Sequence, residues 1–196
     1  LPMEEAFSQQ LKEEELELPA GQFALFMNSM YAVDAYVRDY FRKAVLDALL
    51  AEKLPVTVFG EGWEKYSCGD EHSLRREPAV PFALSFERIA KAHVLLNVSP
   101  IFNRGMHDRV PAGMANHAVV LTDENPYLRR TFTDGKELLF YSLEKPDTLC
   151  EQAERTLTDV RLREKIAASA YETFEREYTW KRRAEQILAF AEEVEA

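Results

Sequence analysis

The sequence predicts an α/β domain that is built on a mainly parallel sheet and ends in a helical tail. Short apolar runs recur along the chain, and each is bounded by proline, glycine or polar turn residues. The segments between these runs repeat apolar side chains every three to four residues, which is the spacing of an amphipathic helix. After residue 145 only this helical spacing remains. Strands that alternate with helices form βαβ units, and these units build a parallel sheet.

Each apolar run is consistent with a strand that is buried on both faces. We expect strands at 23–27, 56–59, 93–98, 118–121 and 138–141. We expect helices at 3–17, 34–53, 86–92, 108–116, 126–132, 146–157, 159–173 and 177–194. The polar, turn-rich residues 64–84 are expected to be irregular.

The chain divides into a polar N-terminal helical segment, residues 1–20, and an α/β domain, residues 21–196. The first segment has a thin apolar stripe among many glutamates, and Pro19 and Gly21 end it. Ligands of a parallel sheet bind at the carboxyl ends of its strands. The loops that follow the expected strands are therefore the places where we expect chemistry.

The composition excludes several functional classes. A net charge of −10 over 196 residues argues against binding of nucleic acid, although a local cationic pocket for a small phosphorylated ligand remains compatible with it. No apolar run reaches the ~18 residues of a membrane helix, and no secretory leader opens the chain, so we expect a cytoplasmic protein without a membrane span. No histidines or carboxylates have the spacing of a metal site, and Cys68 and Cys150 are expected to be reduced.

The loop from Ser99 to Arg109 carries the strongest signal for ligand binding. It leaves an expected strand and enters an expected helix, whose free N–H groups and dipole favour phosphate. Gly105 lets the backbone approach a ligand closely. Arg109 offers charge-assisted hydrogen bonds to a diphosphate, and His107 offers a proton or a hydrogen bond. In the competing interpretation Asp108 only caps the helix and Arg109 is a surface residue, and the residues alone leave both interpretations open.

Three weaker signals lie at the ends of other elements. The glycines of Gly60-Glu61-Gly62-Trp63 fit either a ligand loop or a tight turn, and the third glycine of a dinucleotide fingerprint is missing. Asp123 ends a strand, where it binds a sugar hydroxyl or, in the interpretation we favour, caps the short helix that follows. His117 precedes a strand and is expected to be a turn residue rather than a ligand.

Four sequence motifs occur in an order that is typical of a known family. They are VTVFGEGW (56–63), LLNVSPIFNRGMHDRV (95–110), GMANHAVVLTDENPYLRRTFTDGKELLFY (113–141) and YETFEREYTWKRRAEQIL (171–188). Together they make the stretch from Val56 to Leu188 resemble the carboxy-terminal domain of bacterial GT-B glycosyltransferases of group 1. The resemblance looks closest to the branch related to the spore-maturation protein CgeB. Residues 23–52 fit the first strand and helix of the same domain.

This resemblance implies a Rossmann-like three-layer domain that binds a UDP- or GDP-linked sugar in a cleft between two domains. It also implies an amino-terminal acceptor-binding domain, so the chain, which starts at Leu1, is expected to be a fragment that is inactive alone. GT-B enzymes typically need no bound metal and hold no covalent cofactor. The implied nucleotide-sugar-binding residues are Gly60 and Glu61 in the cleft, Phe82 stacked on the base, Asn103, and Gly105, Met106, His107, Asp108 and Arg109 at the diphosphate.

The chain departs from the family pattern at two positions. Many relatives read Arg-Val-Phe-Glu-Ala-Met, or have Asn for the Glu, where residues 109–114 read Arg-Val-Pro-Ala-Gly-Met. In related retaining enzymes this carboxylate holds the ribose, which Ala112 cannot do. Relatives also commonly place Gly where His117 stands.

Three functional hypotheses follow from these observations. In the first, the domain binds the donor of a glycosyltransferase, cationic groups stabilise the departing diphosphate, and a nucleophile or base comes from the other domain. In the second, the domain is a degenerate, non-catalytic GT-B-like module for binding or interaction, which the absence of a carboxylate at Ala112 favours. In the third, the fold binds a nucleotide that carries no sugar.

Overall fold

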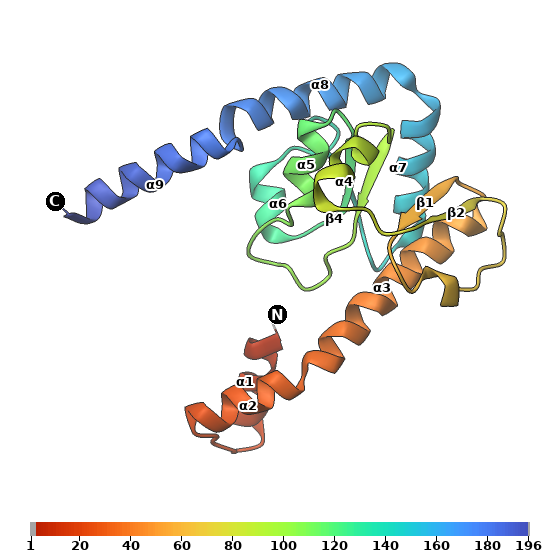
Figure 1. Ribbon diagram of the computed structural model, residues 1–196. Coiled ribbons are helices and arrows are strands. Elements are labelled where there is room, and N and C mark those ends of the chain that lie inside the picture. Colours follow the sequence, from red (N-terminus) through yellow and green to blue (C-terminus); the bar gives the residue numbers. More distant parts are fainter. Residues whose placement is uncertain (1–2, 196) are drawn as a thin grey trace.

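Three helices open the chain in the computed structural model, which describes residues 3–195 (Figure 1). They are α1 (Met3–Glu13), α2 (Ala20–Ser29) and α3 (Tyr31–Ala51). Neither α1 nor α2 buries a residue, whereas the C-terminal half of α3 buries Val45, Leu46, Leu49 and Leu50. The C-terminal half of α3 is therefore the part of this segment that belongs to the core.

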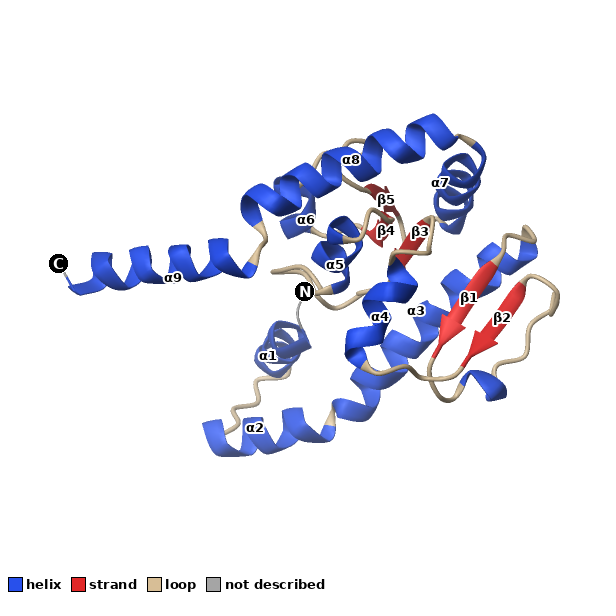
Figure 2. Ribbon diagram, turned by 45° about the horizontal axis from the view of Figure 1, so that its top comes forward, coloured by secondary structure: helices blue, strands red, loops and turns tan. Residues whose placement is uncertain are grey.

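Two parallel sheets follow, and both agree with the α/β architecture that the sequence predicts. Strand β1 (Val56–Phe59) pairs with β2 (Leu74–Glu77), and the second sheet has the order β3 (Val94–Asn97), β4 (Val119–Asp123), β5 (Leu139–Tyr141). The strands stand as two separate groups in Figure 2, and no hydrogen-bonded ladder joins the groups within residues 3–195.

Helices connect these strands and form the tail. They are α4 (Phe82–Ile89), α5 (Arg109–Ala115), α6 (Pro126–Thr131), α7 (Pro146–Thr158), α8 (Val160–Glu177) and α9 (Trp180–Glu195), with a 3-10 turn at Trp63–Lys65. The helical tail is confirmed, and α9 extends away from the sheets (Figure 1). Among the described residues, no helix combines the length and the apolar character that crossing a bilayer requires.

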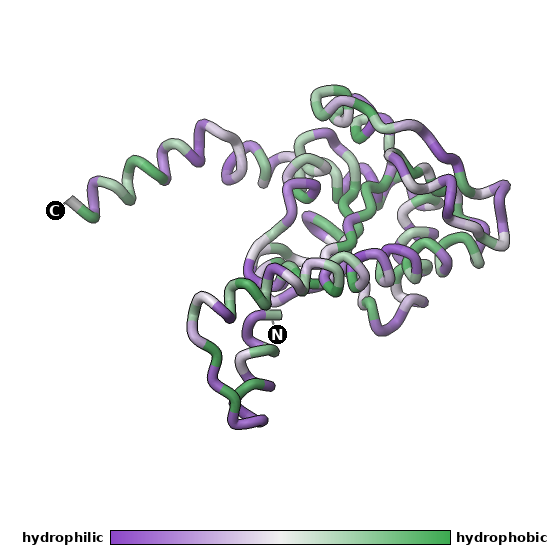
Figure 3. Tube along the Cα trace, turned by 60° about the horizontal axis from the view of Figure 1, so that its bottom comes forward, coloured by the Kyte–Doolittle hydropathy of each residue, from purple (hydrophilic) through white to green (hydrophobic). Residues whose placement is uncertain are grey.

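The three-stranded sheet is the central layer, because successive residues of its strands pack on opposite faces. Val119 and Leu121 of β4 pack in one cluster with residues of α3 and α7, whereas Val120 packs in a second cluster with residues of α5 and α6. Helices thus cover both faces of the sheet. Figure 3 shows hydrophobic and hydrophilic residues alternating along the extended C-terminal helix.

Helix α3 links the two sheets through neighbouring residues. Val45 and Leu49 pack in the cluster of the three-stranded sheet. Leu46 and Leu50, one position further along, pack with Val58 of β1 and with Leu74 of β2. One helix therefore fixes where the β1–β2 ribbon lies relative to the central sheet.

The strand that we expect at 23–27 is wrong, because these residues lie within helix α2. A five-residue apolar run fits a strand or a helix equally well, and periodicity alone cannot separate the two. Pro19 immediately precedes α2 with a φ of −54°, a position that proline tolerates. Met30 ends α2 and directly begins α3, so the helical backbone almost continues.

The irregular segment that we expect at 64–84 is wrong in part, because Leu74–Glu77 forms strand β2. Only Leu74 in this strand is buried, so no apolar run reveals it. Arg76 anchors the strand by donating to the carbonyl oxygens of Trp63 (3.0 Å) and Tyr66 (2.9 Å). Helix α4 also begins at Phe82, directly after Pro81, rather than at residue 86.

The closest approach of a helix to the central sheet occurs at Gly113 of α5. A Cβ atom built on Gly113 would lie 2.5 Å from Cγ2 of Val120 and 3.0 Å from Cδ2 of Leu95. Both neighbours are packed side chains of the sheet, so they cannot yield freely. Gly113 therefore lets α5, which carries Arg109, pack directly on β3 and β4.

We predict that Gly113→Ala lowers the free energy of unfolding by about 1–3 kcal/mol, because the added methyl overpacks this contact. Urea denaturation measures the effect. Gly69→Ala is the matched control, because a Cβ on Gly69 has no neighbour within 4 Å. Equal stability of the two variants would contradict the packing of α5 described above.

Candidate functional site

A buried polar network joins the carboxyl ends of the three central strands. Asn97, at the end of β3, is fully buried and donates from Nδ2 to Oγ1 of Thr122 on β4 (3.0 Å). Its backbone oxygen accepts from the hydroxyl of Tyr141 on β5 (2.9 Å). Its side-chain oxygen accepts from the guanidinium of Arg109 (2.8 Å). Asn97 thus ties Arg109 to the end of the sheet, where parallel α/β folds bind ligands.

Asp123 lies beside this network and does not cap α6, so the interpretation that we favour for it is wrong. Its carboxylate is 3% exposed and accepts from the backbone N–H of Ser99 (2.8 Å). Burial raises the pKa of Asp123 to about 6, although the positive charge of Arg109 and the bond from Ser99 oppose the shift. Asp123 therefore holds the start of the loop that follows β3.

The cap of α6 is Asn125, a residue that the sequence analysis missed. Its side-chain oxygen accepts from the N–H of Leu128 (2.7 Å), and its Nδ2 donates to the carbonyl oxygens of Phe102 (2.8 Å) and Gly105 (3.3 Å). One side chain thus starts a helix and fastens the 99–108 loop. The signal was present in the sequence, because Asn followed by Pro is a typical helix start.

Helix α5 begins at Arg109, but Asp108 does not cap it, because its side chain accepts no hydrogen bond from the backbone of α5. The carboxylate of Asp108 instead lies against Nδ1 of His107. The N–H of Arg109 points at the same Nδ1 (3.2 Å). The expectation of a capping Asp108 is therefore wrong. The ring of His107, rather than the carboxylate of Asp108, accepts from an N–H of the first turn of α5.

The charges of three cationic or potentially cationic side chains, His107, Arg109 and Arg42, influence one another here. Burial lowers the pKa of His107, and the charges of Arg109 and Arg42 lower it further, against the opposing charge of Asp108. Burial and then the charge of Arg42 lower the pKa of Arg109. An arginine stays protonated even so. Arg42 comes from α3, far away in the sequence, so no local pattern indicated it.

The other predicted residues of this loop have different surroundings. Met106 packs against the core cluster of α5 and α6. A Cβ on Gly105 would lie 3.2 Å from the ring of Phe102, so the ring leaves little space beside this glycine. Asn103 is partly buried, and the neighbouring Arg104 forms an ion pair with Glu5 of α1.

The remaining predicted residues lie after β1 and at the start of α4. Gly60 (φ 125°) and Gly62 (φ 90°) adopt left-handed conformations, so the tight turn is present there. Glu61 is exposed between them. Phe82 is 72% exposed, and its ring meets Phe86 edge-on at 5.0 Å. No described hydrogen bond or ion pair joins Gly60, Glu61 or Phe82 to His107 or Arg109.

Two positions where the chain departs from its relatives differ in their surroundings. His117 has a φ of 56° at the end of α5, and its ring stacks on Tyr171 of α8 (4.2 Å). The expectation of a turn residue is confirmed, and the left-handed backbone is one that glycine adopts most easily. Ala112 lies one turn after Arg109 on α5 and provides no carboxylate.

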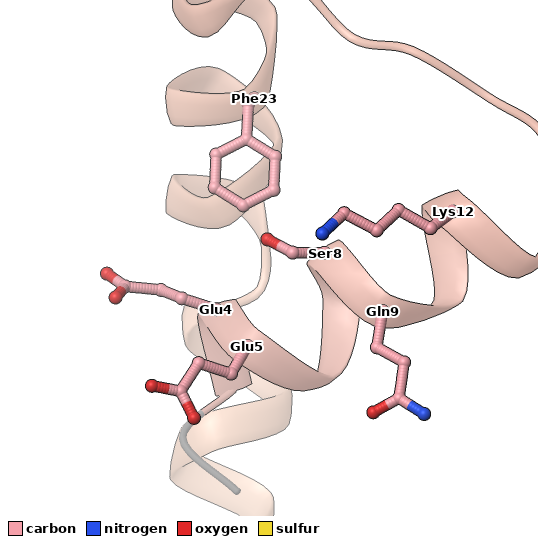
Figure 4. A pocket seen from close by; sticks show the side chains of 6 residues that line it. All are labelled: Glu4, Glu5, Ser8, Gln9, Lys12 and Phe23. Carbon is pink, nitrogen blue, oxygen red and sulfur yellow. The ribbon is translucent and has the colours of Figure 1, made fainter.

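The hollow drawn in Figure 4 contains none of the predicted binding residues. It lies between α1 and α2 and is lined by Glu4, Glu5, Ser8, Gln9, Lys12 and Phe23. The described residues also contain no group of three or more His, Cys, Asp or Glu side chains that could hold a metal ion. The strand ends around Asn97 therefore remain the best candidate site.

We predict that Asp123→Asn stabilises the chain near pH 7 but not near pH 4. A folded-state pKa of about 6 lies above the ordinary 3.8, so the folded state holds the proton more tightly than the unfolded state does. The resulting stability is present below pH 4 and is lost as the pH rises through 6. Asparagine mimics the protonated form of the aspartate. The free energy of unfolding of Asp123→Asn therefore exceeds that of the wild type by about 1–3 kcal/mol at pH 7.

Urea denaturation at pH 4.5 and pH 7.5 measures this advantage. Asp147→Asn is the matched control, because Asp147 is exposed in the first turn of α7. An advantage of Asp123→Asn that is the same at both pH values would contradict the raised pKa.

The chain is similar to known proteins both in sequence and in fold. Residues 38–189 match the model of a family described as glycosyl transferase-like. No curated protein sequence matches the chain. The fold is similar to that of Anabaena Alr3699/HepE in complex with UDP-glucose, with a TM-score of 0.65 and 12% identity over 76% of this chain and 44% of that chain. It is also similar to a glycosyltransferase from Rickettsia africae ESF-5, with a TM-score of 0.64 and 12% identity over 78% and 44% of the respective chains.

The solved structures and the family model show different things about this chain. At 12% identity the solved structures show a shared GT-B-like fold, and the chain spans less than half of the length of each. The family model, in contrast, matches residues 38–189, which make up most of the sequence. The chain therefore belongs to the glycosyl transferase-like family.

Proposed function

We propose that this chain is the donor-binding domain of a glycosyltransferase that transfers a sugar from a nucleotide diphosphate to an acceptor. The observation that carries the proposal is that Asn97 holds Arg109 at the carboxyl ends of parallel strands, next to His107, where the charge of Arg42 also acts. The two arginines bring positive charge to this place in a chain whose net charge is −10. Such a local concentration of cations suits a small, strongly anionic ligand.

A UDP-linked donor is the form that we favour over a GDP-linked one. The Anabaena protein, which shares the fold, was crystallised with UDP-glucose and with UDP. By the resemblance of its motifs, we also assign the chain to the CgeB-related branch and to the bacterial cytoplasm. We further propose that the complete enzyme contains an acceptor-binding domain and that this chain alone is inactive.

The proposed ligand contacts follow the sequence motifs. Gly105, Met106, His107, Asp108 and Arg109 surround the diphosphate, Asn103 lies next to them, Gly60 and Glu61 line the cleft, and Phe82 stacks on the base. The exposed ring of Phe82 supports this role, because an accessible aromatic face is what a base needs for stacking.

The chemistry that these residues supply is stabilisation of the departing diphosphate. Arg109 is held in place by Asn97, so its charge is oriented before the reaction starts. Preorganised charge of this kind needs no rearrangement when the negative charge develops on the leaving group. His107 lies in the same loop, where a lowered pKa favours the neutral ring, which can donate one hydrogen bond to phosphate oxygen.

A non-catalytic binding module is the second candidate, and Ala112 is the observation that favours it. In the family pattern that the motifs resemble, this position carries Glu or Asn. A domain without the ribose contact retains the phosphate contacts but holds the nucleoside less firmly. The donor-binding function requires an anion at the Asn97–Arg109 site, whereas a degenerate module for binding or interaction does not.

We predict that UDP raises the melting temperature of the chain and that Arg109→Gln removes at least 90% of the UDP affinity, because the loss of one charge-assisted contact to phosphate costs about 1.5–3 kcal/mol. Thermal shift and isothermal titration with UDP, GDP and ADP measure the response. Arg161→Gln, an exposed change on α8, is the matched control and should bind as the wild type does.

A wild-type chain that responds to none of the three nucleotides would contradict the donor-binding function and favour the degenerate, non-catalytic module. A response to ADP alone would overturn the UDP-linked donor and favour a nucleotide ligand of another class.

We predict that Ala112→Glu tightens UDP binding about ten-fold, because it introduces a carboxylate that can accept from the ribose hydroxyls. Ala112→Gln is the control for side-chain volume, and titration with UDP compares the two variants. Weaker binding by Ala112→Glu than by Ala112→Gln would show that a carboxylate at this position repels the ligand instead of holding it.

A further inference from the structure

The side of α3 that faces the core carries Val45 and Leu49. One helical turn before Val45, the same side carries the positively charged Arg42. Val45 and Leu49 belong to the buried cluster that also contains Tyr141, the last residue of β5, and Val98, which directly follows β3, packs against that cluster. Arg42 precedes Val45 by three residues, which places it on the same side of α3 and about one turn, or 5 Å, further along the helix. Side chains of a helix also lean toward its N-terminus. Arg42 therefore extends beyond the strand ends.

The direction of α3 supports this placement. Only four residues separate the end of α3 at Ala51 from the start of β1 at Val56, so α3 runs back against the direction of β1. The N-terminal side of α3 then lies on the side where the strands end. Figure 2 shows α3 running alongside the β1–β2 sheet in this way.

No contact within the described chain holds Arg42 firmly. Its one described hydrogen bond goes to Asp39, at 3.5 Å, and the Asp39 side chain is 76% exposed. An exposed pair of this kind contributes little to stability. Arg42 is thus free to turn toward a ligand at small cost.

The charges around Arg42 are unbalanced at the site. Its charge acts on both His107 and Arg109, while the nearby acids are the exposed Asp39, which pairs with Arg42, Asp108, which contacts His107, and the buried Asp123. Two guanidinium groups that repel each other remain in the free protein. An anion bound between them would remove that repulsion, and a diphosphate offers one phosphoryl group to each arginine.

We propose that Arg42 binds the second phosphoryl group of the ligand, so that the site selects nucleoside diphosphates over nucleoside monophosphates. Arg109, which Asn97 orients, binds the first phosphoryl group in either ligand. The inference deepens the proposed function and rests on it. Arg42 is accordingly a residue that determines specificity.

Isothermal titration with UDP and with UMP at one ionic strength tests this role. The wild type is expected to bind UDP at least ten-fold more tightly than UMP. Arg42→Gln is expected to lose about ten-fold in affinity for UDP and to keep its affinity for UMP, whereas Arg109→Gln weakens both. Arg42→Lys keeps the charge and is expected to restore part of the preference, which a merely structural role of Arg42 would not produce.

The outcomes separate this inference from the function on which it rests. A wild type that binds neither nucleotide overturns both. A wild type that binds UDP, together with an Arg42→Gln variant whose UDP and UMP affinities are unchanged or fall equally, overturns only the role of Arg42. Thermal melting of each variant without ligand shows whether it is folded. If Arg42→Gln does not fold, the UDP and UMP affinities of Arg42→Lys test the role of Arg42 instead.

Discussion

The hydrogen bond from the Arg109 guanidinium to the side chain of Asn97 is the interaction on which the candidate site depends. Asn97 has no exposure, and its side chain and backbone also bond to Thr122 on β4 and to Tyr141 on β5. A fully buried amide that is satisfied from several directions has one favourable orientation. Because Arg109 donates to this fixed amide, its guanidinium is also held in one place, at the carboxyl ends of the strands.

The packing of α5 and α3 explains how distant parts of the chain supply charge to one place. Gly113 lets α5 lie directly on the sheet, which positions Arg109 over the end of β3. The inward side of α3 contacts both sheets and, one turn further along, carries Arg42. The cationic cluster is thus a consequence of backbone packing, and it arises in a chain whose overall charge is strongly negative. A negative surface keeps nucleic acid away while a local cluster still accepts a small anion.

Much of the fold could be predicted from the sequence, because β4 and β5 are buried on both faces, β3 is at least partly buried throughout, and all three contain apolar runs. Strand β2 escaped notice because it buries only Leu74. Helix α2 was taken for a strand because its apolar run is short enough for either structure. The failures share a cause, since neither segment shows the periodicity that separates helix from strand.

The candidate site was less accessible to sequence analysis. The loop that ends in Arg109 carries visible signals, but the contacts of Asn97, Asn125 and Asp123 join residues from different strands and loops. Arg42 looks like any arginine on an amphipathic helix until the fold brings it to the sheet. Local sequence patterns therefore indicated the loop, whereas the side chains that hold the loop in place became visible only in the tertiary structure. The ligand-binding roles of the loop residues remain predictions.

A crystal structure of this chain soaked with UDP tests the central claim most directly. The account predicts electron density for the diphosphate beside Arg109 and His107, with Asn97 still bonded to Arg109 and with the Arg42 side chain turned toward the ligand. Ordered UDP elsewhere, such as in the hollow between α1 and α2, with Arg109 untouched, would contradict the account.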